Sequence, residues 1–172
     1  MATPTKKDKY VNVLNQTITM SAADTLTFQE ISMGLNLFDK VGILIHQVRI
    51  DISNAALLGL AEDSDEIEVA MTTSNQLDSL SLTQQAVIDR FSLKASEIGT
   101  AASLVIFREP FILDYTMLPE SGLLVAPKPL YLGMETAGLA SAASANIRLF
   151  FTVVQLKSED YFELLESRQF FG

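Results

Sequence analysis

The sequence predicts an all-β protein: an eight-stranded jelly-roll β-sandwich with a short C-terminal helix. Apolar and polar residues alternate with a period of two along most of the chain, in about eight segments separated by turn signals. The chain has 172 residues, which favours a jelly roll over an immunoglobulin-type sandwich of about 100 residues. We expect a mobile N-terminal arm over residues 1–9 and a single jelly-roll domain over residues 10–172.

The N-terminal half is expected to supply four strands. They are marked by alternating polarity and β-branched residues: Tyr10–Thr19, Thr25–Ile31, Val41–Ile52 and Glu66–Met71. In the third of these, the even-numbered residues from Leu44 onward are expected on one face, where His46 has only aliphatic companions. Ile43 and Ile45 are expected on the opposite face.

The C-terminal half is expected to supply the remaining strands. Residues 103–117 hold two strands around Pro110, and residues 122–135 divide at Pro127 and Pro129, because proline cannot donate to a sheet ladder. The segment Asn146–Leu156 is apolar on both faces and is expected to be a central strand buried on both sides.

Two stretches are expected to be helical. Residues 82–91 predict a short connecting helix. Residues 158–171 predict the C-terminal helix, because Ser158 can cap it and acidic residues lie in its first turns. Tyr161, Leu164 and Leu165 then share one face of that helix.

The charge distribution argues against strong nucleic-acid binding. The net charge is −9; Lys6, Lys7 and Lys9 against Asp8 give the first nine residues +2, which leaves −11 on the other 163. Phosphate backbones are held mainly by lysine and arginine, so we expect at most weak, salt-sensitive contact with nucleic acid through these three lysines.

The sequence lacks the residue sets of common catalytic sites. His46 is the sole histidine and there is no cysteine, which excludes a tetrahedral zinc site built from these residues. No serine-nucleophile elbow, phosphate loop or dinucleotide fingerprint occurs. We therefore expect no enzymatic activity and no cofactor, and a structural His46, half-buried with both ring nitrogens bonded to neighbours.

Two further tracts leave alternatives open. The acidic tract 62–68 is interpreted as a solvated loop, with a calcium site as the alternative. The stretch Thr136–Ile147, rich in alanine, serine and glycine, predicts either a flexible loop or a loop packed closely against a neighbour.

The apolar content suggests surface covered by other subunits. Hydrophobic residues make up 48% of the chain and the mean hydropathy is +0.26, yet no run approaches the ~20 apolar residues of a membrane span. The first twelve residues lack an apolar core, so no secretory signal is expected. Phe170 and Phe171 are the leading candidates for a subunit contact, with a plug capping the sandwich as the alternative.

These features together resemble a single jelly-roll capsid protein of a tailless icosahedral virus. The resemblance implies a structural coat protein, located in the virion, whose partners are copies of itself in a closed shell. The missing arginine-rich arm suits a shell over an internal membrane, or a genome neutralised by another protein or small cations; a second coat protein also stays open. The alternative function is a soluble β-sandwich ligand-binding module of the carbohydrate-binding or adhesin type.

Overall fold

A computed structural model gives the fold. It describes residues 4–35, 40–53, 56–57, 59–60, 62, 64–95 and 111–169, with the backbone alone for residues 4–7 and 167–169. The described elements are β1 Pro4–Lys7, β2 Asn12–Thr19, β3 Thr27–Ile31, β4 Val41–Ile52, β5 Glu66–Thr72, β6 Val87–Lys94, β7 Phe111–Asp114, the 3-10 turn η2 Pro119–Ser121, β8 Leu123–Val125, β9 Leu130–Ala137, β10 Ser144–Leu156 and α2 Ser158–Gln169.

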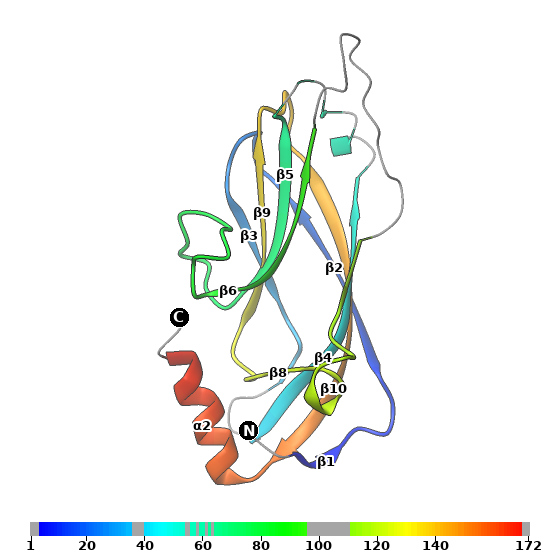
Figure 1. Cartoon of the computed structure of the whole chain (residues 1–172), viewed down its shortest axis with the longest axis vertical. Coiled ribbons are helices and arrows are strands. Elements are labelled where there is room, and N and C mark those ends of the chain that lie inside the picture. Colours follow the sequence, from blue (N-terminus) through cyan, green and yellow to red (C-terminus); the bar gives the residue numbers. More distant parts are fainter. Residues whose placement is uncertain are drawn as a thin grey trace.

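The strands form two antiparallel sheets (Figure 1). One has the order β3-β9-β5-β6. In the other sheet, β10 and β4 pair with each other in the middle. Strands β2 and β1 pair with successive parts of the outer edge of β10. Strands β7 and β8 pair with successive parts of the outer edge of β4. The ten described strands therefore occupy eight positions, four in each sheet. This arrangement confirms the eight-stranded jelly roll that the sequence predicted.

Strand β1 lies within the segment that was expected to be an N-terminal arm. Pro4–Lys7 pairs with β10 at Leu156, Gln155 and Val154, and the Asp8 carboxylate accepts a hydrogen bond from the Val153 N–H at 3.2 Å. The physical reason is the sheet edge: β2 pairs with β10 only as far as Phe151, and the backbone groups beyond it need another strand.

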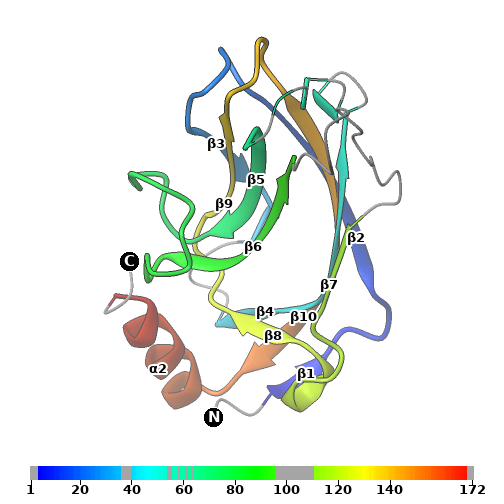
Figure 2. The ribbon, with the colours of Figure 1, turned by 45° about the horizontal axis from the view of Figure 1, so that its top comes forward.

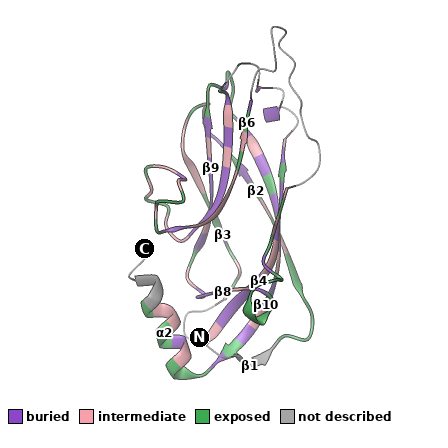
Figure 3. Cartoon of the chain, in the orientation of Figure 1, coloured by how far each residue is buried: buried purple, intermediate pink, exposed green. Residues whose placement is uncertain are grey.

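The main core lies between the two sheets. Its fully buried side chains come from both, with Ile45, Ile50 and Leu149 on one side and Ile67, Val69 and Met134 on the other. Figure 3 shows buried residues running along the middle strands of each sheet. Helix α2 makes a second core: Tyr161, Leu164 and Leu165 pack on Leu44, Val154 and Leu156, on the outer face of the six-stranded sheet (Figure 2).

This second core corrects the expectation for β10. Asn146 and Arg148 are exposed, so the first half of the strand is buried on one face only. Burial on both faces begins where α2 covers the sheet, since Val154 and Leu156 then lie beneath the helix while Val153 packs on the main core.

A β-bulge corrects the predicted faces of β4. Phe150 of β10 is paired with Gln47 and Phe151 with Ile45, which leaves His46 as the extra residue. The inserted residue shifts the alternation by one. Ile43 and Ile45 therefore join Val48 and Ile50 in the main core, whereas Leu44 belongs to the core under α2.

The predicted helix over residues 82–91 is wrong. Turns end at Val87, whose N–H donates to the Gln84 carbonyl, and β6 then pairs with β5. The long β5–β6 connection packs on the outer face of its sheet, where Leu80 is fully buried in a small core with Ala70 and Val87. Glycine at position 133 permits this packing, because a Cβ there would lie 2.6 Å from the Leu80 side chain.

Candidate functional site

His46 lies at the bulge with both ring nitrogens bonded. Nδ1 is 2.7 Å from the Ser121 carbonyl oxygen and Nε2 is 3.1 Å from the Thr152 hydroxyl. A carbonyl can only accept, so Nδ1 donates to Ser121, whereas the Thr152 hydroxyl can either donate to or accept from Nε2. The ring is half-buried and ties the β7–β8 loop to β10, a structural position of the kind that the sequence analysis expected.

The β7–β8 loop, residues 115–122, is fixed by its own backbone as well. The Tyr115 N–H donates to the His46 carbonyl at 2.9 Å, the Leu118 N–H to the Tyr115 carbonyl at 3.0 Å, and the Ser121 N–H to the Leu118 carbonyl at 2.9 Å. With the His46 ring at its far end, the loop is bonded to β4 at both ends.

Side-chain bonds and backbone strain add to this. The N–H and hydroxyl of Thr116 both donate to the Asp114 carboxylate, at 2.9 and 2.7 Å, and these bonds lower the pKa of Asp114. Glu120 and Ser121 have φ of 63° and 58°, in the left-handed region where a non-glycine residue costs roughly 1–3 kcal/mol. The surrounding bonds hold this strained turn in place.

The loop presents apolar side chains to solvent. Met117 is 94% exposed, more than any other large apolar side chain that the structure describes, and the neighbouring Leu118 is 43% exposed. This projection was not predicted from the sequence. The available signal was an apolar pair inside the turn sequence that contains Pro119 and Gly122.

A pocket of about 430 Å³ opens where β3 ends and β9 begins. Apolar side chains from three segments make up most of its lining: Ile31, Met33, Leu35, Ile43, Pro127 and Pro129. Among the described residues of the lining, Glu30 and Lys128 are charged. This chemistry suits an apolar side chain or ligand with a polar group beside it.

Two contacts join the sheets at the edge formed by β6 and β7. The Tyr115 hydroxyl donates to the Asp89 carboxylate at 2.9 Å, and the rings of Phe91 and Phe111 stack with centroids 3.6 Å apart. Burial raises the pKa of Tyr115, and the negative charge of Asp89 raises it further. The loop that carries Met117 is thereby attached to both sheets.

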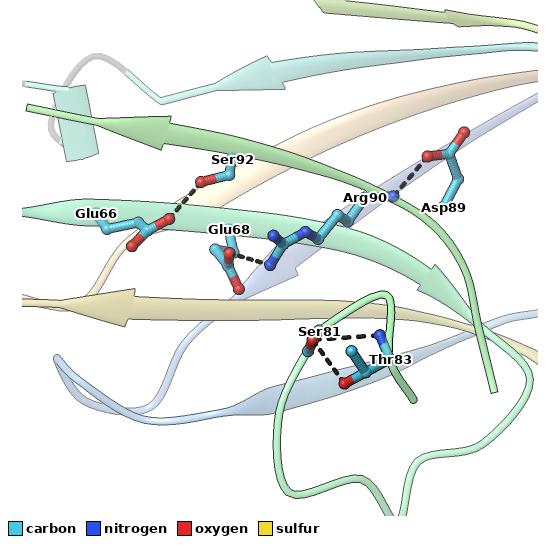
Figure 4. Close-up of polar contacts among 7 residues, drawn as sticks. All are labelled: Glu66, Glu68, Ser81, Thr83, Asp89, Arg90 and Ser92. Carbon is cyan, nitrogen blue, oxygen red and sulfur yellow. Dashed lines mark hydrogen bonds and ion pairs between the residues drawn. The ribbon is translucent and has the colours of Figure 1, made fainter. Parts of the chain in front are cut away.

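The outer face of β5 and β6 holds two carboxylates of the acidic tract, Glu66 and Glu68 (Figure 4). Glu68 pairs with Arg90 across the strands, and the Ser92 hydroxyl donates to Glu66. Burial raises the pKa of Glu68, an effect that Arg90 opposes and that the carboxylates of Glu66 and Glu135 reinforce. No group of three or more metal-ligating side chains is assembled among the described residues.

The solvated-loop interpretation of this tract is wrong for Asp65. Asp65 is 5% exposed and accepts a hydrogen bond from the Glu62 N–H at 2.8 Å. It caps the turn before β5 rather than facing water. Asp63, another member of the tract, lies outside the described residues.

The predicted contact residues are placed only in part. Lys6 and Lys7 lie in β1, where the backbone alone is described, and Lys9 is exposed with its ammonium 5.3 Å from the Tyr10 ring centroid. Phe170 and Phe171 lie outside the described residues. In the described part of the chain, no helix is long and apolar enough to cross a membrane.

Comparison with solved structures places the whole jelly roll beside polyomavirus proteins. VP1 of trichodysplasia spinulosa-associated polyomavirus, in complex with 3'-sialyllactose, matches with a TM-score of 0.55 and 7% identity over 92% of this chain and 99% of that one. The shared property is the fold. The unassembled pentamer of Merkel cell polyomavirus VP1 matches with a TM-score of 0.52 and 6% identity, over 91% of this chain and 99% of that one. No family model and no curated protein matches the sequence.

Proposed function

We propose that this chain is a structural capsid protein whose copies assemble into a closed icosahedral shell, and that it resides in the virion. The observation that carries the proposal is the eight-position jelly roll, which spans nearly the full length of both this chain and its VP1 neighbours. Those neighbours are capsid proteins, and one is a pentamer. The proposed role is structural and needs no catalytic group.

The exposed apolar side chains support self-association. They are spread over several sides of the domain: Tyr10, Val11 and Val13 around β2, Leu82 in the β5–β6 connection, Ile112 in β7, Met117 and Leu118 in the β7–β8 loop, and Phe162 on α2. Contacts of different patches between identical chains either close into rings and shells or grow without limit. A closed shell covers such patches and stops growing.

Size-exclusion chromatography combined with negative-stain microscopy tests the proposal. We expect the purified protein to form closed particles or discrete ring-shaped oligomers at high concentration. A protein that stays monomeric across a range of concentration, salt and calcium, with no coat partner restoring assembly, would instead support the soluble ligand-binding module. A shell that forms only with a second coat protein or over a lipid vesicle would identify these as required partners.

We propose Phe170 and Phe171 as one subunit contact. Deletion of residues 169–172 is expected to abolish assembly and retain the fold, because α2 is already anchored through Tyr161, Leu164 and Leu165. Circular dichroism reports the fold and chromatography reports the assembly. Loss of the fold would support the intramolecular plug. Glu163→Ala, at an exposed polar position of α2, is the control and is expected to leave assembly unchanged.

We propose that contact with nucleic acid is weak and passes through Lys6, Lys7 and Lys9. Because β1 pairs with β10, replacing all three lysines by glutamine tests this better than truncation, which would uncover the sheet edge. The variant is expected to lose the residual, salt-sensitive binding, measured by fluorescence anisotropy of a labelled oligonucleotide at two salt concentrations. Tight binding that persists at physiological salt would show that the acidic body carries a site.

A further inference from the structure

The β7–β8 loop and the pocket at the start of β9 have complementary properties. The loop presents Met117 and Leu118 to solvent from a backbone that is bonded at both ends. The pocket is an apolar hollow of about 430 Å³. Because the loop backbone is already held by hydrogen bonds, docking orders only the exposed side chains, so the loop is pre-organised for docking.

The loop cannot fill the pocket of its own chain. Strand β8 runs from the end of the loop to the pocket and is paired with β4 along its whole length, at Ile45, Leu44 and Ile43. Three extended residues span about 10 Å, so this paired strand holds Met117 away from Pro127. Met117 and Leu118 can therefore contact an apolar pocket of this kind only on a second molecule.

Their placement suits a repeating contact between copies. Figures 1 and 2 show the loop and the β8–β9 connection in the same half of the molecule, at opposite ends of β8. When two different patches lie at the same height along a rotation axis, the contact between them can repeat around that axis and close into a ring. Asp114 and Glu120 flank the projection, and the pocket lining holds one basic side chain that can oppose them, Lys128, together with the exposed Glu30.

We infer that Met117 and Leu118 of one copy insert into the pocket of the next copy, with Glu120 facing Lys128. The inference rests on the proposed capsid function, which it deepens by naming one contact of the assembly. Glu30, the other charged residue of the pocket lining, stays at the rim in this arrangement. The contact joins described residues that the sequence analysis did not single out.

Cysteine cross-linking tests the contact directly, because the chain has no cysteine of its own. Met117→Cys and Ser32→Cys, the latter an exposed and nearly isosteric position in the pocket lining, are purified separately, mixed under assembly conditions and oxidised. We expect a disulfide-linked dimer in the mixture, and a ladder of linked oligomers from the double variant. Gln85→Cys, at an exposed polar position on another loop, replaces Met117→Cys in the control mixture and is expected to give little product.

A second pair of variants measures the strength of the contact. Met117→Glu is expected to raise the concentration needed for assembly by about tenfold to hundredfold, since it removes the burial of one large apolar side chain. Gln85→Glu introduces the same charge at an exposed polar position of the β5–β6 connection and is expected to leave assembly unchanged. Both substituted side chains point into solvent, so circular dichroism is expected to show the same fold for each.

The outcomes separate this contact from the proposed function. If particles form but the Met117–Ser32 pair does not cross-link above the control, the contact is overturned and the capsid function stands. If Met117→Glu blocks assembly without that cross-link, the loop docks elsewhere, on a second coat protein or a lipid surface, and the pocket assignment is wrong. If the intact protein never associates, both proposals fall.

Discussion

A valine in place of Gly138 is expected to lower the free energy of unfolding by about 3–5 kcal/mol, through backbone strain and a collision together. Gly138 has φ +80°, a conformation that a β-branched residue hardly adopts. A Cβ at this position would also fall on the Asp65 carboxylate. Asp65 has no room to yield, because it is buried and its carbonyl accepts the Ala95 N–H at 2.7 Å.

Gly34 provides the matched control. It has φ +65° and nothing within 4 Å of a built Cβ, so Gly34→Val carries the strain without the collision and is expected to cost about 1–3 kcal/mol. Urea unfolding followed by circular dichroism gives both values. Equal losses for the two variants would show that the packing of Asp65 against Gly138 contributes nothing.

The strands were predictable because one face of each lies against a core. The segments Thr25–Ile31 and Glu66–Met71 differ from β3 and β5 by no more than two residues at either end. In β5, Ile67 and Val69 are buried at alternate positions while Glu66 and Glu68 are partly exposed. One-sided burial of a strand produces period-two patterning, so the pattern predicts the fold class as well as the strands.

The bulge and the β5–β6 connection were not predictable in the same way. An inserted residue at His46 shifts the alternation without changing the composition, and only the partner strand shows it. In residues 82–91, polar and apolar residues are spaced as in an amphipathic helix. From Val87 onward the chain forms a strand and not a helix, because β5 offers backbone hydrogen-bond partners along β6.

The exposed β7–β8 loop was not predicted from the sequence for a related reason. The sequence pattern predicted a strand from Pro110 as far as Met117, whereas β7 ends at Asp114. The chain leaves the sheet there because Tyr115 turns inward and bonds to Asp89 of β6. Asp89 is 26 residues away in the sequence, so the local pattern around Tyr115 does not indicate this contact.

Loss of this bond in Tyr115→Phe is expected to lower the free energy of unfolding by about 1.5–3 kcal/mol near neutral pH, the range for a hydrogen bond to a charged group. The hydroxyl is 2.9 Å from Asp89 and the ring is 8% exposed. Phenylalanine fills the same space, so the variant removes the bond and leaves the packing. The β7–β8 loop would lose one attachment to the four-stranded sheet.

The same contact sets an alkaline limit on stability. Burial and Asp89 raise the pKa of Tyr115 above its value of about 10 in the unfolded chain. A group whose folded pKa is raised contributes stability that is complete below the unfolded pKa and is lost as the pH rises through it toward the folded pKa. The wild-type free energy of unfolding is therefore expected to fall above about pH 10 by about 1.4 kcal/mol per pH unit.

Urea unfolding at pH 8, 10 and 11 measures this slope. The free energy of unfolding of Tyr115→Phe is expected to be lower than that of the wild type at pH 8 and to fall less between pH 10 and pH 11, so that the two curves converge. Tyr131→Phe, which deletes a half-buried hydroxyl on β9 without touching Asp89, is the control for general alkaline effects. Parallel curves for wild type and Tyr115→Phe would contradict the coupling, because a tyrosine that ionises equally in both states contributes no pH dependence.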